Sequence, residues 1–138
     1  MEAKEILTPK NMFLALGTTV IVMSFYGMAN GDEWAEYGWG EDNVLAHDEA
    51  YEEMWALHLM PLGVMAMITG MVVTGKELAR MAMFSPVVLV ILVVGMTVLA
   101  SDNGYSTDPP GGISGILGGI MMIAVILTCA SGFMHKDE

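Results

Sequence analysis

Four long stretches of this chain contain no Asp, Glu, Lys or Arg. The stretches are residues 11–31, 54–75, 81–101 and 109–134. Each has about twenty residues or more, and a helix of that length, rising about 1.5 Å per residue, crosses a hydrocarbon core about 30 Å thick. Because the backbone groups of a segment in lipid must be hydrogen-bonded within that segment, we predict that each stretch forms a transmembrane helix.

The composition agrees with a membrane protein and excludes several other classes. Hydrophobic residues make up 54% and charged residues only 15% of the 138 residues, whereas soluble domains have about a quarter charged residues. The single cysteine, Cys129, excludes an internal disulfide framework and a Cys-rich zinc site. The 16 acids against 5 Lys and Arg residues exclude a sequence-independent nucleic-acid binder.

Local signals refine the ends of the spans. Thr8 and Pro9 supply a capping hydroxyl and a proline suited to the first turn of a helix. Gly75 is predicted to stop the second span, and Ser85-Pro86 to start the third or to kink it near its inner end. The prolines and glycines at 109–112 break the chain before the fourth span.

We therefore predict a single all-α integral membrane domain over residues 1–138. Its four transmembrane helices are expected at about 11–31, 54–75, 81–101 and 112–134, with an acidic outer loop at 32–53 between the first two. The sequence Gly27-Met28-Ala29 has the small-x-small form of a signal cleavage site, and we expect the first span to remain uncleaved.

The charges predict the orientation of the four helices. The basic residues all fall in the N-terminus, the second connection and the C-terminus, namely Lys4, Lys10, Lys76, Arg80 and Lys136. In a four-span protein these three segments lie on one side, and the positive-inside rule makes both termini cytoplasmic in a cell (inner or plasma) membrane. Five acids balance the charge there, so the net charge of −11 belongs to the outer side. The outer acids are Asp32, Glu33, Glu36, Glu41, Asp42, Asp48, Glu49, Glu52, Glu53, Asp102 and Asp108.

The segment 32–53 combines nine acids with several aromatic residues. Its first half, through Gly40, is expected to be an irregular loop, and its second half a helix that begins near His47. The aromatic residues are typical of an interfacial belt, and the acids of a solvated surface. The alternative is a vestibule that attracts cations or a docking face for a basic extracytoplasmic protein.

A metal site is the most specific form of that alternative. His47, Asp48 and Glu41 offer ligands for copper or zinc. His47 and His58 cannot share one metal, because eleven residues of continuous helix separate them by about 16 Å. A folded-back loop at 41–47, or residues of another subunit, would have to complete such a site.

His58 is the only ionisable side chain other than tyrosine and cysteine within a predicted span. Pro61 cannot donate to the carbonyl of Leu57, so an acceptor is free nearby. One interpretation is a histidine that is hydrogen-bonded at the interface. The others are a proton relay, or a cofactor-binding residue that serves as axial ligand to a haem or a chlorophyll.

The fourth span begins with small residues at helix-packing intervals. Gly111, Gly115 and Gly119 repeat every four residues, and so do Ser114 and Gly118. Such a stripe lets another helix backbone come close. Ala66 and Gly70 form a shorter version in the second span. The partner helix can belong to this chain or to another subunit.

The run Asp48-Glu49-Ala50-Tyr51-Glu52-Glu53-Met54-Trp55-Ala56-Leu57 leads the acidic segment into the second span. It resembles the E-F-x-x-Y-W-M run that precedes an early helix in the C subunits of copper membrane monooxygenases, which oxidise methane or ammonia. The resemblance covers about twenty residues. The family's copper ligands, an aspartate with two histidines on other helices, have no counterpart here. The resemblance therefore implies a small accessory subunit, of which the archaeal ammonia-oxidising assemblies contain several.

We expect no catalytic residue in this chain, because it has no carboxylate within a span, no cysteine pair and no catalytic fingerprint. The favoured hypothesis is a non-catalytic accessory subunit of a membrane oxidoreductase complex, surrounded by lipid and by other membrane subunits, with copper in the host complex. The alternatives are a pigment- or haem-binding subunit that uses His58, and a stand-alone carrier or channel with an acidic outer vestibule.

Overall fold

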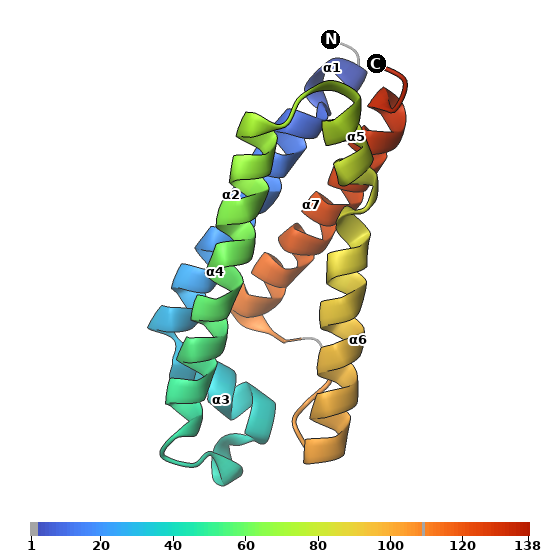
Figure 1. The fold of residues 1–138 in the computed structure, drawn as a ribbon. Coiled ribbons are helices and arrows are strands. Elements are labelled where there is room, and N and C mark those ends of the chain that lie inside the picture. The colour runs from blue at the N-terminus through green and yellow to red at the C-terminus, as the bar shows by residue number, and fades with distance from the viewer. Residues whose placement is uncertain (1–2, 109) are drawn as a thin grey trace.

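The computed structural model describes residues 3–108 and 110–138, and these residues form helices joined by short connections (Figure 1). Met1, Glu2 and Pro109, the last of them in the predicted break before the fourth span, lie outside the described residues. In chain order the helices are α1 (Ala3–Ile6), α2 (Pro9–Ala29), α3 (Gly31–Trp39), the 3-10 helix η1 (Glu41–Asn43), α4 (Asp48–Val72), α5 (Gly75–Met83), α6 (Ser85–Asn103) and α7 (Gly112–His135).

The predicted four-span architecture is confirmed in the described residues. Pro9–Ala29, Asp48–Val72, Gly75–Asn103 and Gly112–His135 are long and apolar enough to cross a membrane, as in a multi-pass membrane protein. Both termini and the α4–α5 connection lie at one end of the bundle, and α3 lies at the other (Figure 1). The charge pattern predicted that these three segments share a side.

The two termini contact each other directly. Lys4 pairs with the carboxylate of Glu138, and the ring of His135 contacts both that carboxylate and the Lys4 carbonyl. The hydrogen bonds from Lys4 and then from His135 hold the pKa of the Glu138 carboxyl below its usual value. This cluster closes the end of the bundle on which the basic residues lie.

The predicted start of the first span is confirmed in detail. The Thr8 hydroxyl accepts a hydrogen bond from the Asn11 amide at 3.2 Å, and Pro9 occupies the first turn. The hydroxyl satisfies one of the amides that a helix start leaves free, and proline has no amide to satisfy there.

Helices α2 and α4 pack with their backbones in contact. A Cβ atom built on Gly17 would lie 2.6 Å from the Gly63 carbonyl oxygen, and one on Gly63 would lie 2.9 Å from the Gly17 oxygen. The two helices also approach closely at one end of the interface. There, a Cβ atom built on Gly70 would lie 2.9 Å from the Cβ atom of Phe13. Ala66 packs against the buried cluster around Phe13. The predicted Ala66–Gly70 surface is thus used within the chain.

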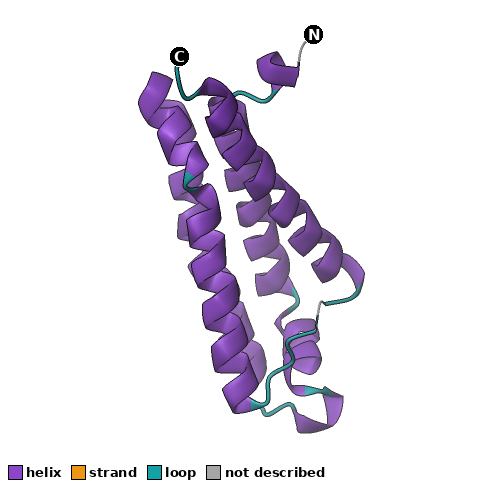
Figure 2. Ribbon diagram, turned by 90° about the vertical axis from the view of Figure 1, so that its right-hand side faces the viewer, coloured by secondary structure: helices purple, strands orange, loops and turns teal. Residues whose placement is uncertain are grey.

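The third span is two helices rather than one. Helix α5 ends at Met83 and α6 begins at Ser85, whose hydroxyl donates to the Ala82 carbonyl at 2.8 Å. Figure 2 shows the short break between them in an otherwise continuous column. Gly75 was expected to end the second span, but α4 already ends at Val72 and Gly75, with φ of 60°, begins α5. Gly75 therefore adopts its left-handed conformation at the first residue of α5 and does not cap the end of α4.

The expectation of an irregular loop after the first span is wrong. Residues 31–39 form α3, whose buried positions Gly31, Ala35 and Gly38 face the bundle. The helix ends at Gly40, where φ is 82°. Glycines at 31 and 38 favour a loop by intrinsic propensity, but tertiary packing overrides propensity. The missing side chains let α3 lie against α4 and Tyr105. By contrast, α4 begins at Asp48, directly after His47, as predicted.

Helix α6 stands apart from the bundle formed by α2, α4 and α7 (Figure 1). None of its residues is buried, although it is strongly apolar. It is joined to the rest of the chain through α5, α7 and the connection after Asn103. Helix α7, by contrast, packs closely on α5, since a Cβ on Gly132 would lie 2.6 Å from the Met83 amide nitrogen.

We predict that Gly63→Leu destabilises the protein, because its side chain would displace the α2 backbone. Overpacking of this kind costs at least about 1–3 kcal/mol. The matched control is Gly118→Leu, at a helical glycine with no atom within 4 Å of its Cβ position. Thermal unfolding in detergent should give a lower Tm for the first variant and an unchanged Tm for the second. Equal Tm values for both variants would refute the α2–α4 contact.

Candidate functional site

The end of the molecule away from the termini carries its excess negative charge. We call it the acidic end: α3, η1, the first turns of α4, the last turn of α6 and the described residues 104–108 and 110–111. It holds eleven acidic residues. The two segments of the sequence to which they belong, residues 11–75 and 81–135, contain no Lys or Arg. The acidic end therefore projects a field that attracts cations.

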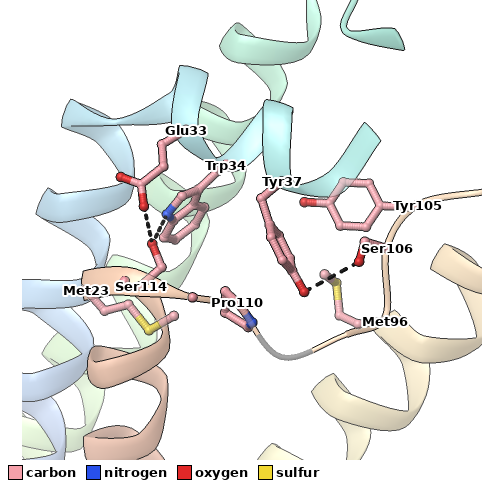
Figure 3. A pocket seen from close by; sticks show the side chains of 11 residues that line it. Met23, Glu33, Trp34, Tyr37, Met96, Tyr105, Ser106, Pro110 and Ser114 are labelled. Atoms are coloured by element: carbon pink, nitrogen blue, oxygen red, sulfur yellow. Dashed lines mark hydrogen bonds between the residues drawn. The ribbon is translucent and has the colours of Figure 1, made fainter. Parts of the chain in front are cut away.

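A cavity of about 420 Å³ lies under α3 at this end (Figure 3). We call it the Trp34 cavity, and its wall comes from α2, α3, α6, α7 and the connecting residues Tyr105, Ser106, Pro110 and Gly111. The side chains labelled in the figure are Met23, Glu33, Trp34, Tyr37, Met96, Tyr105, Ser106, Pro110 and Ser114.

One side of the Trp34 cavity is a network of polar contacts. The Trp34 indole donates to the Ser114 hydroxyl at 3.0 Å, and that hydroxyl donates to the Glu33 carboxylate at 3.3 Å. The Tyr26 hydroxyl donates to the other oxygen of Glu33 at 2.6 Å. The network ties α3 to α7 and α2. Ser114 therefore makes polar contacts within the chain and is not part of a surface of small residues against which another helix packs.

The other side of the cavity is the segment after α6, which docks on α3. The Ser106 amide donates to the Gly38 carbonyl at 2.7 Å, and its hydroxyl lies 3.5 Å from the Tyr37 hydroxyl. The Tyr105 ring occupies the space that a side chain at 38 would fill, and it meets Trp39 edge to face at 5.1 Å. Residue 38 must therefore be glycine for this docking.

A second cavity, of about 310 Å³, opens between α3, α4 and α6. We call it the Glu52 cavity. It is lined by Trp39, Tyr51, Glu52, Trp55, Met96, Leu99, Ala100, Asn103 and Tyr105. Glu52 is only 8% exposed, and no cationic side chain of the described residues pairs with it.

Tyr105 is shared by the Trp34 and Glu52 cavities. Burial raises the pKa of its phenol well above the ordinary value, and the negative charge and hydrogen bonding of Glu52 raise it further. Tyr105 therefore remains a neutral hydroxyl beside the carboxylate at any physiological pH.

A third cavity, of about 240 Å³, is apolar and lies deeper between the long helices. We call it the apolar crevice. It is lined by Phe13, Leu16, Val20, Leu59, Leu62, Met65, Ala66, Thr69, Ser85, Val88, Leu89, Leu92, Met121 and Val125. The crevice exists because α6 does not pack against α2 and α4.

The predicted metal ligands are only partly brought together. His47 Nε2 lies 3.6 Å from an Asp48 carboxylate oxygen, and the other oxygen accepts the Leu45 amide at 2.7 Å. Glu41 lies in η1, and no group of three or more His, Cys, Asp or Glu side chains in the described part of the chain could hold a metal ion. A metal at His47, Asp48 and Glu41 would need ligands from another molecule.

His58 lies on the exposed surface of α4, outside all three cavities. Its Nδ1 atom is 2.5 Å from the Met54 carbonyl oxygen, one turn earlier in the helix. The histidine is therefore hydrogen-bonded to its own helix, and it does not use the acceptor that Pro61 frees at Leu57. Because a carbonyl oxygen only accepts, Nδ1 is the donor in this contact, and in the neutral ring Nε2 has the free lone pair.

The predicted glycine stripe of the fourth span is not a packing surface within the described part of this chain. Cβ atoms built on Gly111, Gly118 and Gly119 would meet nothing within 4 Å. Gly115 lies against the Pro110 carbonyl in the turn before α7. The open glycines leave a flat strip of helix backbone on the surface.

Sequence reasoning missed Glu52 and Tyr105. Nine acids stand between residues 32 and 53, and nothing in that count distinguishes Glu52. A helical period provides the missing signal, because Glu52 shares a face of α4 with the buried Ala56, Leu59 and Gly63. Tyr105 carries no such signal, since its position depends on how the 104–108 segment docks.

The chain matches no protein-family model, and neither the comparison with curated proteins nor that with solved structures finds a significant match.

We predict that alkaline conditions destabilise the protein through Tyr105. An unfolded tyrosine loses its proton near pH 10, whereas the folded chain holds the Tyr105 proton to higher pH. The stability from this group is thus complete below about pH 10 and is lost as the pH rises toward the folded pKa. Phenolate absorbance, compared between the wild type and Tyr105→Phe, isolates this group among the 4 tyrosines.

Glu52→Gln should lower the pKa of Tyr105 without restoring its ordinary value, because burial is the larger cause. Glu36→Gln, at an exposed carboxylate outside the cavities, is the control and should leave the pKa unchanged. Loss of the Tyr105 proton near pH 10 in the folded wild type would contradict the assignment.

Proposed function

We propose that this chain is a non-catalytic accessory subunit of a multisubunit membrane complex. The observation that carries the proposal is α6, a long apolar helix of which no residue is buried within the chain. Helices α2, α4 and α7 each have several buried residues. Helix α6 therefore has its own packing surface left for another protein.

The surface of α6 that faces away from the cavities has the character of a packing surface. Val87, Ile91, Val94 and Val98 follow helical spacing and are 51%, 66%, 56% and 55% exposed. Gly95 lies beside them with no atom within 4 Å of its Cβ position. In lipid, helices associate by close packing rather than by hydrophobic burial, so stiff β-branched side chains around a glycine favour association.

The glycines of α7 extend this argument to a second helix. Gly118 and Gly119 face open space, so a neighbouring helix backbone can approach α7 there without displacing any side chain of this chain. This observation favours a role in assembly.

The finer proposal is that the host complex is an oxidoreductase of the copper membrane monooxygenase type. It rests on the acidic-aromatic run at 48–57, which resembles the segment before an early helix of those C subunits. In such a complex the other subunits would hold the copper. We also propose that both termini face the cytoplasm of a cell membrane, so that the acidic end meets cations or a basic protein outside.

A second function, binding of a haem or chlorophyll, is favoured by one observation at His58. Its Nδ1 bond to the Met54 carbonyl resembles the outer-shell hydrogen bond of metal-ligating histidines, which orients the ring and leaves Nε2 for the metal. The ring is exposed on α4, so the tetrapyrrole would lie on the lipid side or between subunits.

To test assembly, we predict that Gly95→Leu reduces the amount of intact complex at least about tenfold, equivalent to about 1.4 kcal/mol. The added side chain would intrude on a helix contact, whereas in the isolated chain its Cβ atom would have no atom within 4 Å. Ile91→Val on the same surface keeps a β-branched side chain, so it is the control and should assemble normally. Native gels and mass spectrometry of mild detergent extracts measure the complex. A wild-type chain that migrates alone would refute the accessory role.

To test pigment binding, we predict that the protein purified from its own membrane absorbs above the aromatic band, and that His58→Ala removes this absorption. His47→Ala is the control, since His47 lies at the start of α4 beside Tyr51, away from His58. A wild-type spectrum with only the aromatic band would reject the second function.

A further inference from the structure

We propose that the space between α4 and α6 binds a single-chain amphiphile with a phosphate-free ammonium headgroup. The headgroup would lie in the Glu52 cavity and the tail in the apolar crevice. This inference is independent of the accessory role, because it concerns the inner side of α6 and not the outward surface around Ile91.

The two cavities follow each other along the same pair of helices. On α4, Trp55 lines the Glu52 cavity and Leu59 lines the apolar crevice. On α6, Met96 lines the Glu52 cavity and Leu92 lines the apolar crevice. Four residues are about 6 Å of helix, so one cavity begins about one turn from the other.

The Glu52 cavity has the chemistry of an organic-cation site. Four aromatic side chains, those of Trp39, Tyr51, Trp55 and Tyr105, line it together with the Glu52 carboxylate. Aromatic faces attract ammonium groups, and this is how choline-like ligands are recognised. A carboxylate that is 8% exposed and has no cationic partner among the described residues offers a counter-charge.

The apolar crevice has the chemistry and length of a tail site. Thr69 and Ser85 are the polar residues in its wall, and the Ser85 hydroxyl already donates to Ala82. Along α4 the wall runs from Leu59 to Thr69, about 15 Å of helix. An alkyl chain that entered from the Glu52 cavity would therefore remain in contact with apolar side chains over this length.

The charge of the acidic end argues against a phospholipid. It holds eleven carboxylates, and the segments of the sequence that contain them, residues 11–75 and 81–135, have no Lys or Arg. A phosphate placed there would meet like charges and no cation to bind it. An ammonium group without a phosphate is attracted by the same field.

The size of the cavities argues against a helix of another protein as occupant. They measure about 310 and 240 Å³, close to the lower end of small-molecule sites, which begin at about 300 Å³. A helix is about 10 Å across with its side chains. It would enter only if α6 moved away, whereas a single alkyl chain is much narrower than a helix.

The test uses the full chain in a nonionic detergent with radiolabelled hexadecyltrimethylammonium as the probe. Retention of the probe with the protein on gel filtration measures binding. We expect saturable binding of about one probe per chain. Hexadecyl sulfate should not compete, since its tail is the same but its charge is opposite. Tetramethylammonium, which has the headgroup alone, should compete at least about a hundredfold more weakly than unlabelled probe.

Three variants assign the binding to this site. Glu52→Gln should weaken it at least about tenfold, and Leu92→Trp should weaken it by filling the apolar crevice. Glu36→Gln removes the same charge from an exposed position outside the cavities and should leave binding unchanged. Thermal unfolding of each variant checks that the chain remains folded. Should Glu52→Gln fail to fold, Trp55→Leu provides the headgroup test.

Several results would overturn the proposal. One is equal competition by hexadecyl sulfate, which would show a crevice without charge selectivity. Another is equal weakening by Glu36→Gln and Glu52→Gln, which would show general attraction to the acidic end. The third is absence of binding to the isolated chain, together with a cross-link from position 92 to another subunit, which would show that a protein helix fills the space.

Discussion

The backbone contact between α2 and α4 at Gly17 and Gly63 sets the positions of most other elements. Where two helices meet without side chains between them, their relative position has little freedom, because any shift creates either a void or a clash. The same contact orients the first turns of α4 toward α3. It thereby buries Glu52, which lies on the α4 face that also carries Gly63.

Helix α6 has no comparable anchor. It follows α5 after a short break, contacts α7, and is tied to α3 through the docking of Tyr105 and Ser106. Two distinct surfaces result from this loose attachment. One faces inward and leaves the apolar crevice and the Glu52 cavity, and the other faces outward with β-branched side chains around Gly95. A small ligand and a partner helix would therefore use different sides of α6.

The acidic end combines two kinds of carboxylate with different physical roles. Glu33 is held by the hydroxyls of Tyr26 and Ser114, so its charge serves to join three helices. Glu52 is buried among aromatic rings with a neutral Tyr105 beside it and no cationic partner among the described residues. A buried charge without a counter-charge is costly, and a cationic ligand would supply the missing partner.

The sequence alone determined the four helices and the sharing of one side by the termini, because charge-free length and charge placement need no neighbours to take effect. It also determined the start of α2 at the Thr8 cap and of α4 after His47. Only the tertiary structure decided that residues 31–39 are helical, since contacts with α4 and Tyr105 override the glycines' preference for a loop. It likewise decided which glycines pack against another helix. The spacing at Gly118 permits the close approach of a helix, but it is Gly63 that has a helix, α2, packed against it.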